Sequence, residues 1–325
     1  MYTLREIRIG KAAAVNNNRI RFSCPINNKD GTLVMFTLTT DTSIDVFRNK
    51  LDELGVYWVP LTYTIDGVVY EDNFSDDEHY KAFYDKIRAG ALPVTSQINP
   101  YTHEEFWEKV IEKAGKNDIV HLTLSSGLSE TYSSACKAAQ NFMEKHHDVK
   151  IYVVDTLGAT QAAVPVFEKA LSLRDQGVRA DIAAESLRAY THRIQVYVVA
   201  DDLFHLKRGG RVSAAAAIIG SMISIKPLIV LSDAGKLVVY KKPLGWKKAV
   251  KMIFDHIDEY CAEPNTKKFW IAHADCLDKA EEVKKAIEAR YPGATVQIGW
   301  IGPVIGAHTG CGTLGVLFEG NSRLL

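Results

Sequence analysis

The sequence predicts an α/β protein made of two α/β domains with mostly parallel sheets. From Leu33 onward, short runs of β-branched or aromatic residues alternate with longer segments of helical period. The same alternation returns in the second half of the chain. Because a domain usually takes roughly 100 to 200 residues, the chain of 325 residues is expected to form two.

The first expected unit is a strand, a helix and a second strand. Val34–Leu38 forms a short apolar run that is followed by the polar segment Thr39–Ser43. A helix ending at Gly55 leads into a strand over Val56–Tyr63. Asp66-Gly67 is typical of a tight hairpin turn, so we expect an antiparallel excursion there.

The clearest unit begins at Thr102, which forms a capping box with Glu105 and so predicts a helix start. A strand over Ile119–Leu124, the polar loop Ser125–Ser129 and a second amphipathic helix follow. A strand over Ile151–Val154 then closes a crossover between parallel strands.

The second half repeats this order of strands and helices, with one expected hairpin at Asp233-Ala234-Gly235. The expected elements are strands 196–199, 228–231, 237–240, 269–272 and 296–301, and helices 250–260 and 280–289. We therefore predict an N-terminal extension over 1–32 that forms a hairpin, an N-terminal domain over 33–160 and a C-terminal domain over 161–325.

Composition excludes several classes of protein. Thirty-nine Lys and Arg balance 39 Asp and Glu, so we expect no nucleic-acid partner. The uncharged stretch Val212–Ile225 is too short to span a bilayer, and charges near the N-terminus argue against a secretory signal. The five cysteines are scattered, which predicts no metal site. We expect a cytoplasmic protein without an integral membrane segment.

Hydroxyl-rich loops follow several of the expected strands. These segments are Thr39–Ser43, Thr62, Thr95–Gln97, Ser125–Ser129 and Asp155-Thr156. In an open parallel sheet, ligands bind beyond the carboxyl ends of the strands. Helix capping explains any one of these loops, but the five together indicate a site for a single small anion, because neutral hydroxyls each donate one hydrogen bond.

Nucleotide motifs are not supported, so no cofactor is expected. Gly310–Gly315 satisfies G-x-G-x-x-G, yet only ten residues follow it, which leaves no room for the rest of a dinucleotide-binding unit. No Walker A sequence occurs. A hydrolase could combine Ser96 or Ser129 with His308 and Asp41, although the G-x-S-x-G motif is absent.

An ordered set of motifs resembles the DegV family of fatty-acid-binding proteins. The motifs are Thr-Thr-Asp-Thr at 39–42, Val-Pro-Leu-Thr at 59–62, Thr-Ser-Gln at 95–97, the Leu-Ser-Ser-Gly-Leu-Ser run at 124–129, His-Leu-Lys-Arg-Gly-Gly-Arg-Val-Ser at 205–213, and Gly-Pro-Val-Ile-Gly-Ala-His-Thr-Gly at 302–310. The resemblance implies a ligand cleft between two α/β domains that holds a long-chain fatty acid. It also implies a non-catalytic protein that presents the carboxylate to a bacterial fatty acid kinase subunit for acyl-phosphate formation, a step in phospholipid metabolism.

The same resemblance implies which residues bind the ligand. The carboxylate-binding residues fall on Thr62, Ser96 and His308, and a protonated His308 would offset the cost of burying the carboxylate. Further candidates in the ligand loops are Thr95, Gln97, Gly127, Leu128, Ser129, Thr309 and Gly310. A carrier of another amphipathic anion would use the same site, so that alternative stays open, as does a hydrolase of small acids or esters that uses Ser96 and His308.

The acyl tail needs an apolar lining. The apolar residues of the Ala-rich segment that follows the basic turn are the candidates, namely Ile218, Ile219, Met222 and Ile223, although ordinary core packing would use the same residues. Arg208 and Arg211 in the turn itself are candidates for contact with a partner or for an ordinary solvated loop.

Overall fold

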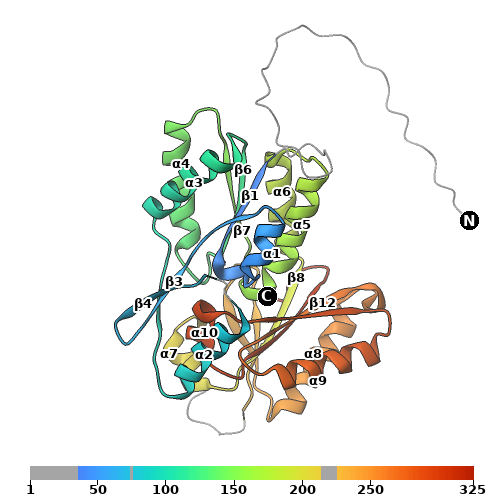
Figure 1. The fold of residues 1–325 in the computed structure, drawn as a ribbon. Coiled ribbons are helices and arrows are strands. Elements are labelled where there is room, and N and C mark those ends of the chain that lie inside the picture. The colour runs from blue at the N-terminus through green and yellow to red at the C-terminus, as the bar shows by residue number, and fades with distance from the viewer. Residues whose placement is uncertain (1–35, 74–75, 214–224) are drawn as a thin grey trace, which may run out of the picture.

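The structure is a computed structural model that describes residues 36–73, 76–213 and 225–325. It confirms an α/β fold with two sheets and their covering helices, and adds a small third sheet (Figure 1). The extension expected over residues 1–32 lies outside the described residues. No helix in the described ranges is long and apolar enough to cross a bilayer.

The first sheet contains four parallel strands between two pairs of helices. Its order is β2-β1-β6-β7, with every neighbouring pair parallel. Helices α3 and α4 cover one face and α5 and α6 the other, as Figure 1 shows. The bounds are β1 Thr37–Asp41, β2 Tyr57–Val59, β6 Ile119–Thr123, β7 Ile151–Asp155, α1 Arg48–Glu53, α3 Pro100–Ala114, α4 Thr131–Lys145, α5 Val164–Asp175 and α6 Ala180–Thr191.

Two local predictions in this part were wrong in detail. The helix expected to start at Thr102 begins at Pro100, because the Asn99 side chain accepts a hydrogen bond from the Thr102 backbone N–H at 2.9 Å and so caps it. The strand expected over Val56–Tyr63 is two strands, since Pro60 lacks an N–H group and ends β2.

A three-stranded antiparallel sheet leaves the first sheet and packs against the second half of the chain. The expected turn at Asp66-Gly67 is confirmed, with both residues at positive φ. The bounds are β3 Thr62–Ile65, β4 Val68–Glu71, β5 Val94–Ser96 and α2 Asp77–Arg88. Both this sheet and α2 contact α10, Pro303–Thr309. The excursion therefore brings its polar residues to a helix that lies more than 200 positions later in the chain.

The second sheet has seven strands in the order β13-β12-β14-β8-β10-β11-β9. Only β12 with β13 and β11 with β9 are parallel, so the prediction of mostly parallel sheets holds for the first sheet and is wrong for this one. Buried strands show the same apolar run in either direction, and the sequence pattern therefore did not reveal the antiparallel pairs. The bounds are β8 Ile194–Val199, β9 Val212–Ser213, β10 Leu228–Leu231, β11 Leu237–Lys241, β12 Lys268–His273, β13 Thr295–Trp300, β14 Leu314–Glu319, α7 Leu203–Gly209, α8 Trp246–Tyr260 and α9 Leu277–Arg290.

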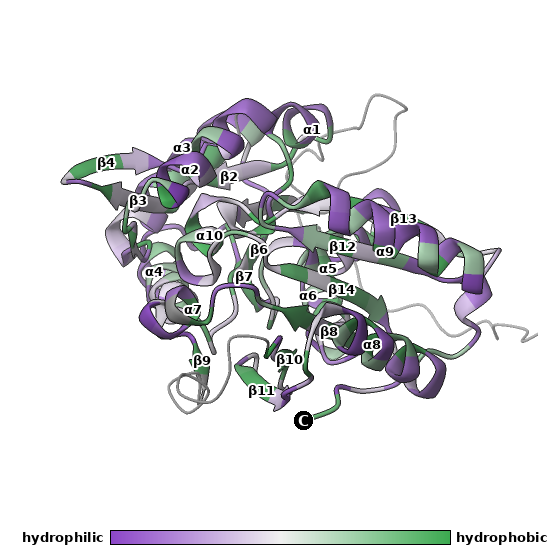
Figure 2. Cartoon of the chain, turned by 90° about the horizontal axis from the view of Figure 1, so that it is seen from below, coloured by the Kyte–Doolittle hydropathy of each residue, from purple (hydrophilic) through white to green (hydrophobic). Residues whose placement is uncertain are grey.

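Alternate residues of the central strands enter two different cores. Tyr197 and Val199 of β8 pack in the cluster that includes residues of α8 and α9, whereas Val196 and its neighbour Val198 face the first part of the molecule. Figure 2 shows β8 and β14 as strongly hydrophobic strands beside the more polar α8. With apolar residues on both faces, the sheet becomes a wall between two cores.

The contacts of α5 and α6 bear on the division between the domains. Both helices follow the expected boundary at residue 160, yet they pack against β1, β6 and β7 of the first sheet. These contacts favour a division after Thr191, before β8 begins. The boundary itself stays a prediction.

Two buried histidines lie against each other where α3 packs on the first sheet, His103 on the helix and His121 on β6. His103 and His121 are fully buried, with ring centroids 5.2 Å apart, and the Thr39 hydroxyl contacts His121 Nδ1 at 2.8 Å. Burial lowers the pKa of His103 from 6.5 to about 4 and lowers that of His121 well below its ordinary value. Both rings are therefore neutral in the folded protein near neutral pH.

We predict that the free energy of unfolding falls as the pH drops below about 6.5, because these two histidines then bind protons in the unfolded chain but not in the folded protein. For His103 alone, a pKa shift from 6.5 to about 4 corresponds to about 3 kcal/mol at pH 4. His103→Phe should flatten the decline measured by urea unfolding between pH 7 and pH 4.5, while the exposed control His147→Gln should not. An equal decline in all three proteins would contradict this prediction.

Candidate functional site

A cavity of about 580 Å³ opens where the three-stranded sheet, a loop of the first sheet and α10 meet. This volume lies within the range of small-molecule sites. The lining residues are Leu61, Thr95, Ser96, Gln97, Leu124, Ser126, Gly127, Leu128, Ser129, Glu130, Gly210, Arg211, Leu237, Val304, Ile305, His308 and Thr309. Nine of the residues expected from the sequence are among them. Arg208, Thr62 and Gly310 are not.

His308 near the end of α10 is held from both sides of its ring. Its Nδ1 lies 2.8 Å from the Gly209 carbonyl, which can only accept, so Nδ1 carries a proton. Its Nε2 lies 2.8 Å from the Thr95 hydroxyl. In the neutral ring Nε2 is the acceptor, and Thr95 donates to it.

The electrostatic surroundings keep His308 neutral in this structure. Burial lowers the pKa of His308, and the nearby Arg211, His205 and Arg208 lower it further, while the Gly209 carbonyl acts in the opposite direction. The protonated ring expected from the sequence is thus disfavoured in the absence of an anion.

The seating of α10 fixes the position of this ring. The Gly302 N–H, at the N-cap of the helix, donates to the buried Asp45 carboxyl group at 2.8 Å. The Tyr84 hydroxyl donates to the Ile301 carbonyl at 2.5 Å. A Cβ on Gly209 would overlap the His308 backbone, so only glycine allows α7 to approach so closely.

Thr62 and Ser96 lie directly opposite each other on β3 and β5. Their side chains therefore share one face of the three-stranded sheet. Ser96 is exposed and lines the cavity, whereas Thr62 is half-buried and does not appear in the lining. The pairing brings together two of the three residues that the sequence assigned to a carboxylate.

The loop Ser125–Ser129 forms the facing wall and is held by contacts from the second sheet. The Ser125 hydroxyl donates to the Gly235 carbonyl at 2.8 Å and accepts from the Gly127 N–H at 3.1 Å. Arg211 Nε donates to the Leu128 carbonyl at 3.1 Å. Gly127 has no side chain, and a Cβ there would overlap Gly235.

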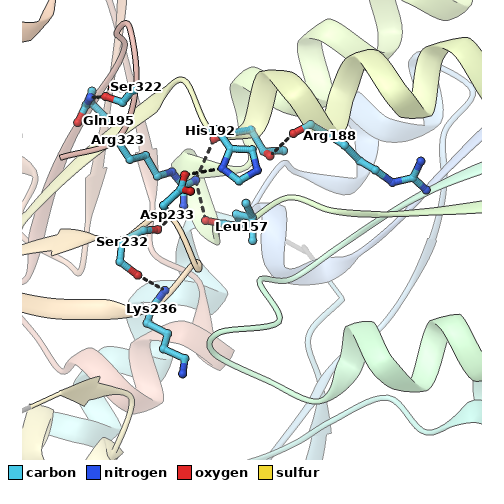
Figure 3. Close-up of polar contacts among 10 residues, drawn as sticks. Leu157, Arg188, His192, Gln195, Ser232, Asp233, Lys236, Ser322 and Arg323 are labelled. Atoms are coloured by element: carbon cyan, nitrogen blue, oxygen red, sulfur yellow. Dashed lines mark hydrogen bonds and ion pairs between the residues drawn. The ribbon is translucent and has the colours of Figure 1, made fainter. Parts of the chain in front are cut away.

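The buried Arg323 connects three segments of the chain through hydrogen bonds to their carbonyl groups (Figure 3). Arg323 donates to the carbonyls of Ser232 at 2.8 Å, Leu157 at 2.9 Å and Thr191 at 3.0 Å. The Ser232 turn contains Gly235, which binds the loop through Ser125. Sequence reasoning missed Arg323, because one arginine after an apolar strand carries no pattern.

A small apolar slot of about 60 Å³ adjoins the polar cavity. The two share Leu128, Leu237, Ile305 and Thr309 as lining. The rest of the slot is Ala159, Thr160, Ala162, Val196, Val198, Leu231, Ala272, Ile301, Thr313, Gly315 and Leu317. Its floor is the face of the second sheet that is turned toward the first. In the sequence, Ala272 and Gly315 stand out as small residues within runs of bulky ones, and this was the available signal for the slot.

The residues expected to line the tail stay a prediction, because the described part of the chain does not include them. Ile218, Ile219, Met222 and Ile223 lie outside the described residues. Arg208 is exposed near the end of α7 and donates to His205 Nδ1 at 3.2 Å. Gly310 ends α10 at positive φ, and the G-x-G-x-x-G run continues into β14 rather than into a helix, as expected.

The contacts do not assemble a catalytic triad from the candidates. Nε2 of His308 contacts Thr95 rather than a serine, and the Ser129 hydroxyl lies 3.0 Å from that of Thr131. Asp41 is buried and accepts from the Leu124 N–H at 2.7 Å and from Ser43. Across the described ranges, no three His, Cys, Asp or Glu side chains gather as a metal site would require.

Comparisons with known proteins agree with this arrangement. The model of the DegV family, described as an uncharacterised protein family, matches residues 35–321. A DegV domain-containing protein of Clostridium perfringens is 36% identical over 288 residues, which cover 89% of this chain and 98% of the relative. One of Streptococcus pyogenes is 35% identical, covering 89% of this chain and 99% of the relative.

Solved structures are similar in fold over most of the chain. The structure of DegV from Bacillus subtilis, described as a fatty acid binding protein, has a TM-score of 0.77 at 26% identity and covers 89% of this chain and 100% of its own. A Thermus thermophilus DegV family protein, whose structure is described in terms of fatty acid binding, has a TM-score of 0.76 at 27% identity, covering 88% and 100%. The chain belongs to the DegV family.

Proposed function

We propose that this protein binds a long-chain fatty acid, with the carboxylate in the polar cavity and the tail in the apolar slot. The observation that carries the proposal is the junction of the two spaces, which share four lining residues. Hydroxyls, an imidazole and Arg211 surround the polar end, while the slot is lined almost wholly by carbon. The relatives from Bacillus subtilis and Thermus thermophilus, described as fatty acid binding, support the same ligand.

The two ends of the ligand have different tasks. Each buried methylene contributes about 0.8 kcal/mol, so the tail supplies most of the affinity. The carboxylate loses water on binding and needs charge-assisted hydrogen bonds in return. Thr62, Ser96 and His308 are the proposed donors, with Thr95 and the loop Gly127–Ser129 beside them.

We also propose where the protein works and that it is not an enzyme. We take the protein to be a cytoplasmic carrier rather than an enzyme, because the contacts give neither Ser96 nor Ser129 a histidine as its base. Because the slot measures only about 60 Å³, neighbouring side chains must move to admit a tail. Another amphipathic anion would fit the same polar end, and extraction of the bound lipid separates these ligands.

We predict that Ser96→Ala and His308→Ala each weaken fatty-acid binding by about 10- to 100-fold, as the loss of one hydrogen bond to a charged group implies. Binding is measured by calorimetry with palmitate, and mass spectrometry of a solvent extract identifies any lipid that is carried from the cell. Ser172→Ala is the matched control, because Ser172 is exposed on α5 and neither lines the cavity nor bonds to a residue that does. Wild-type affinity in both site variants would show that the head-group assignment is wrong, and ester turnover by the chain alone would favour the hydrolase.

The state of His308 makes the affinity depend on pH. Burial and the neighbouring cations lower the pKa of the free ring, and a bound carboxylate would raise it, so binding takes up a proton between the two values. We therefore expect the affinity to fall as the pH rises through this window, by at most about tenfold per pH unit. His308→Gln should abolish the slope measured by calorimetry in two buffers, and a slope that persists in this variant would refute the role of His308.

The carboxylate end of the site opens toward a surface where a partner could reach it. Ser96, Gln97 and Arg211 are exposed and line the cavity, and Arg208 is exposed in the last turn of α7, three residues before Arg211. We propose that a separate kinase subunit docks here and transfers the γ-phosphoryl group of ATP to a carboxylate oxygen, releasing ADP and an acyl-phosphate.

Hydroxylamine trapping tests this step, since it converts an acyl-phosphate to a hydroxamate. We predict product only when fatty acid, ATP, this protein and a fatty acid kinase subunit are all present. Arg208→Gln should raise the KM of the kinase for this carrier by a larger factor than it changes the fatty-acid affinity, because Arg208 does not line the cavity and acts on His308 only through its charge. Product without the kinase subunit, or an unchanged KM, would count against the corresponding part of the proposal.

A further inference from the structure

A row of small side chains crosses the second sheet beneath the apolar slot. Ala272 of β12 lies opposite Gly315 of β14 on one side and Gly299 of β13 on the other. Gly315 in turn lies opposite Val198 of β8. Paired residues share a face, so these four positions form one shallow track across the strands.

The side chain of Gln161 lies over one end of this track. Gln161 belongs to the short helix η2, Thr160–Ala162, and is only 2% exposed. A Cβ on Gly299 would overlap its amide group, which places that amide directly above Gly299. The amide of Gln297 donates to Gln161 Oε1 at 3.5 Å. The track is therefore open above Ala272 of β12, where the slot lies. Above Gly299 of β13 the Gln161 side chain covers it.

A second, larger cavity begins on the far side of Gln161. It has a volume of about 660 Å³, and both Gln161 and Gly299 are in its lining. Phe47, Leu277 and Trp300 contribute apolar surface to it. The other two residues of η2 line the slot instead. One buried amide thus separates the slot from a space more than ten times its volume.

We propose that Gln161 sets the maximum length of the acyl tail, an inference that rests on the proposed function. A tail that lies along the track from the polar cavity meets the amide after passing Ala272. Methylenes there would lose space to the side chain and would desolvate an amide without offering it a hydrogen bond. Removal of the amide would join the slot to the second cavity and let the tail continue over Gly299.

Affinities for a series of saturated fatty acids of increasing length test this inference by calorimetry. In the wild type, each added methylene should raise the affinity about fourfold until the tail reaches Gln161, and then no further. In Gln161→Ala the rise should continue through at least one further pair of methylenes. Asn49→Ala is the matched control, because it removes an amide from the lining of the second cavity and leaves the hydrogen bond of Gln161 to Gln297 in place.

Gly315→Ala gives a second test that does not depend on the fold of the first variant. Its added methyl group would lie 3.6 Å from Ala272 and 3.7 Å from Val198, which are ordinary contacts, so the protein should fold. The methyl group should lower the affinity for the longer tails. A length profile unchanged in Gln161→Ala, or in Gly315→Ala, would overturn the inference while leaving fatty-acid binding intact. A wild type that binds no fatty acid of any length would instead refute the proposed function.

Discussion

The buried guanidinium of Arg323 joins the parts that form the binding cavity. It is 8% exposed and forms no salt bridge within the described residues, yet it donates to carbonyls from three separate segments. Burial lowers its pKa to about 10, so it stays charged near neutral pH. A buried charge seldom adds stability compared with an apolar side chain of similar size. Its value here is geometric, because a planar fork with several donors fixes the relative positions of α6, the loop after β7 and the turn after β10.

Further hydrogen bonds connect two of those segments to the loop Ser125–Ser129, which forms one wall of the cavity. The turn after β10 reaches the loop through Gly235 and Ser125. The loop after β7 reaches it through Asp155, whose carboxylate accepts from the N–H groups of both Leu157 and Ser126. Two independent routes therefore end at neighbouring residues of one loop. A cavity whose walls come from different sheets keeps its shape only if such contacts set the distance between them.

The sequence predicted the polar end of the site far better than the apolar end. Hydroxyl-rich loops, a histidine between glycines and their family resemblance depend on local motifs, and Thr95, Ser96 and His308 indeed lie around one cavity. The apolar slot depends on strand register, which brings Ala272 beside Gly315 across more than 40 positions of sequence. A strand buried on both faces shows no alternation, so the direction of the strands in the second sheet could not be read from the sequence. Ala272 and Gly315 stand out as small residues, but only the strand register shows that they lie side by side. The tail residues expected in the Ala-rich segment lie outside the described part of the chain, so their role stays a prediction.

Under the proposed function, the charge of the carboxylate would complete the hydrogen bonding of the site. Without an anion, His308 is neutral and its Nε2 accepts from Thr95, which satisfies both groups. A carboxylate that approached this pair would favour the protonated ring, and Nε2 would then become a donor to it. Ester and alcohol head groups carry no charge to drive this proton uptake. They would have to break the contact between Thr95 and His308 without compensation, so the same tail with a neutral head should bind more weakly. Under the proposed function, selectivity for an ionised acid would follow from the protonation state of one imidazole, and the sheet beneath it would select the tail.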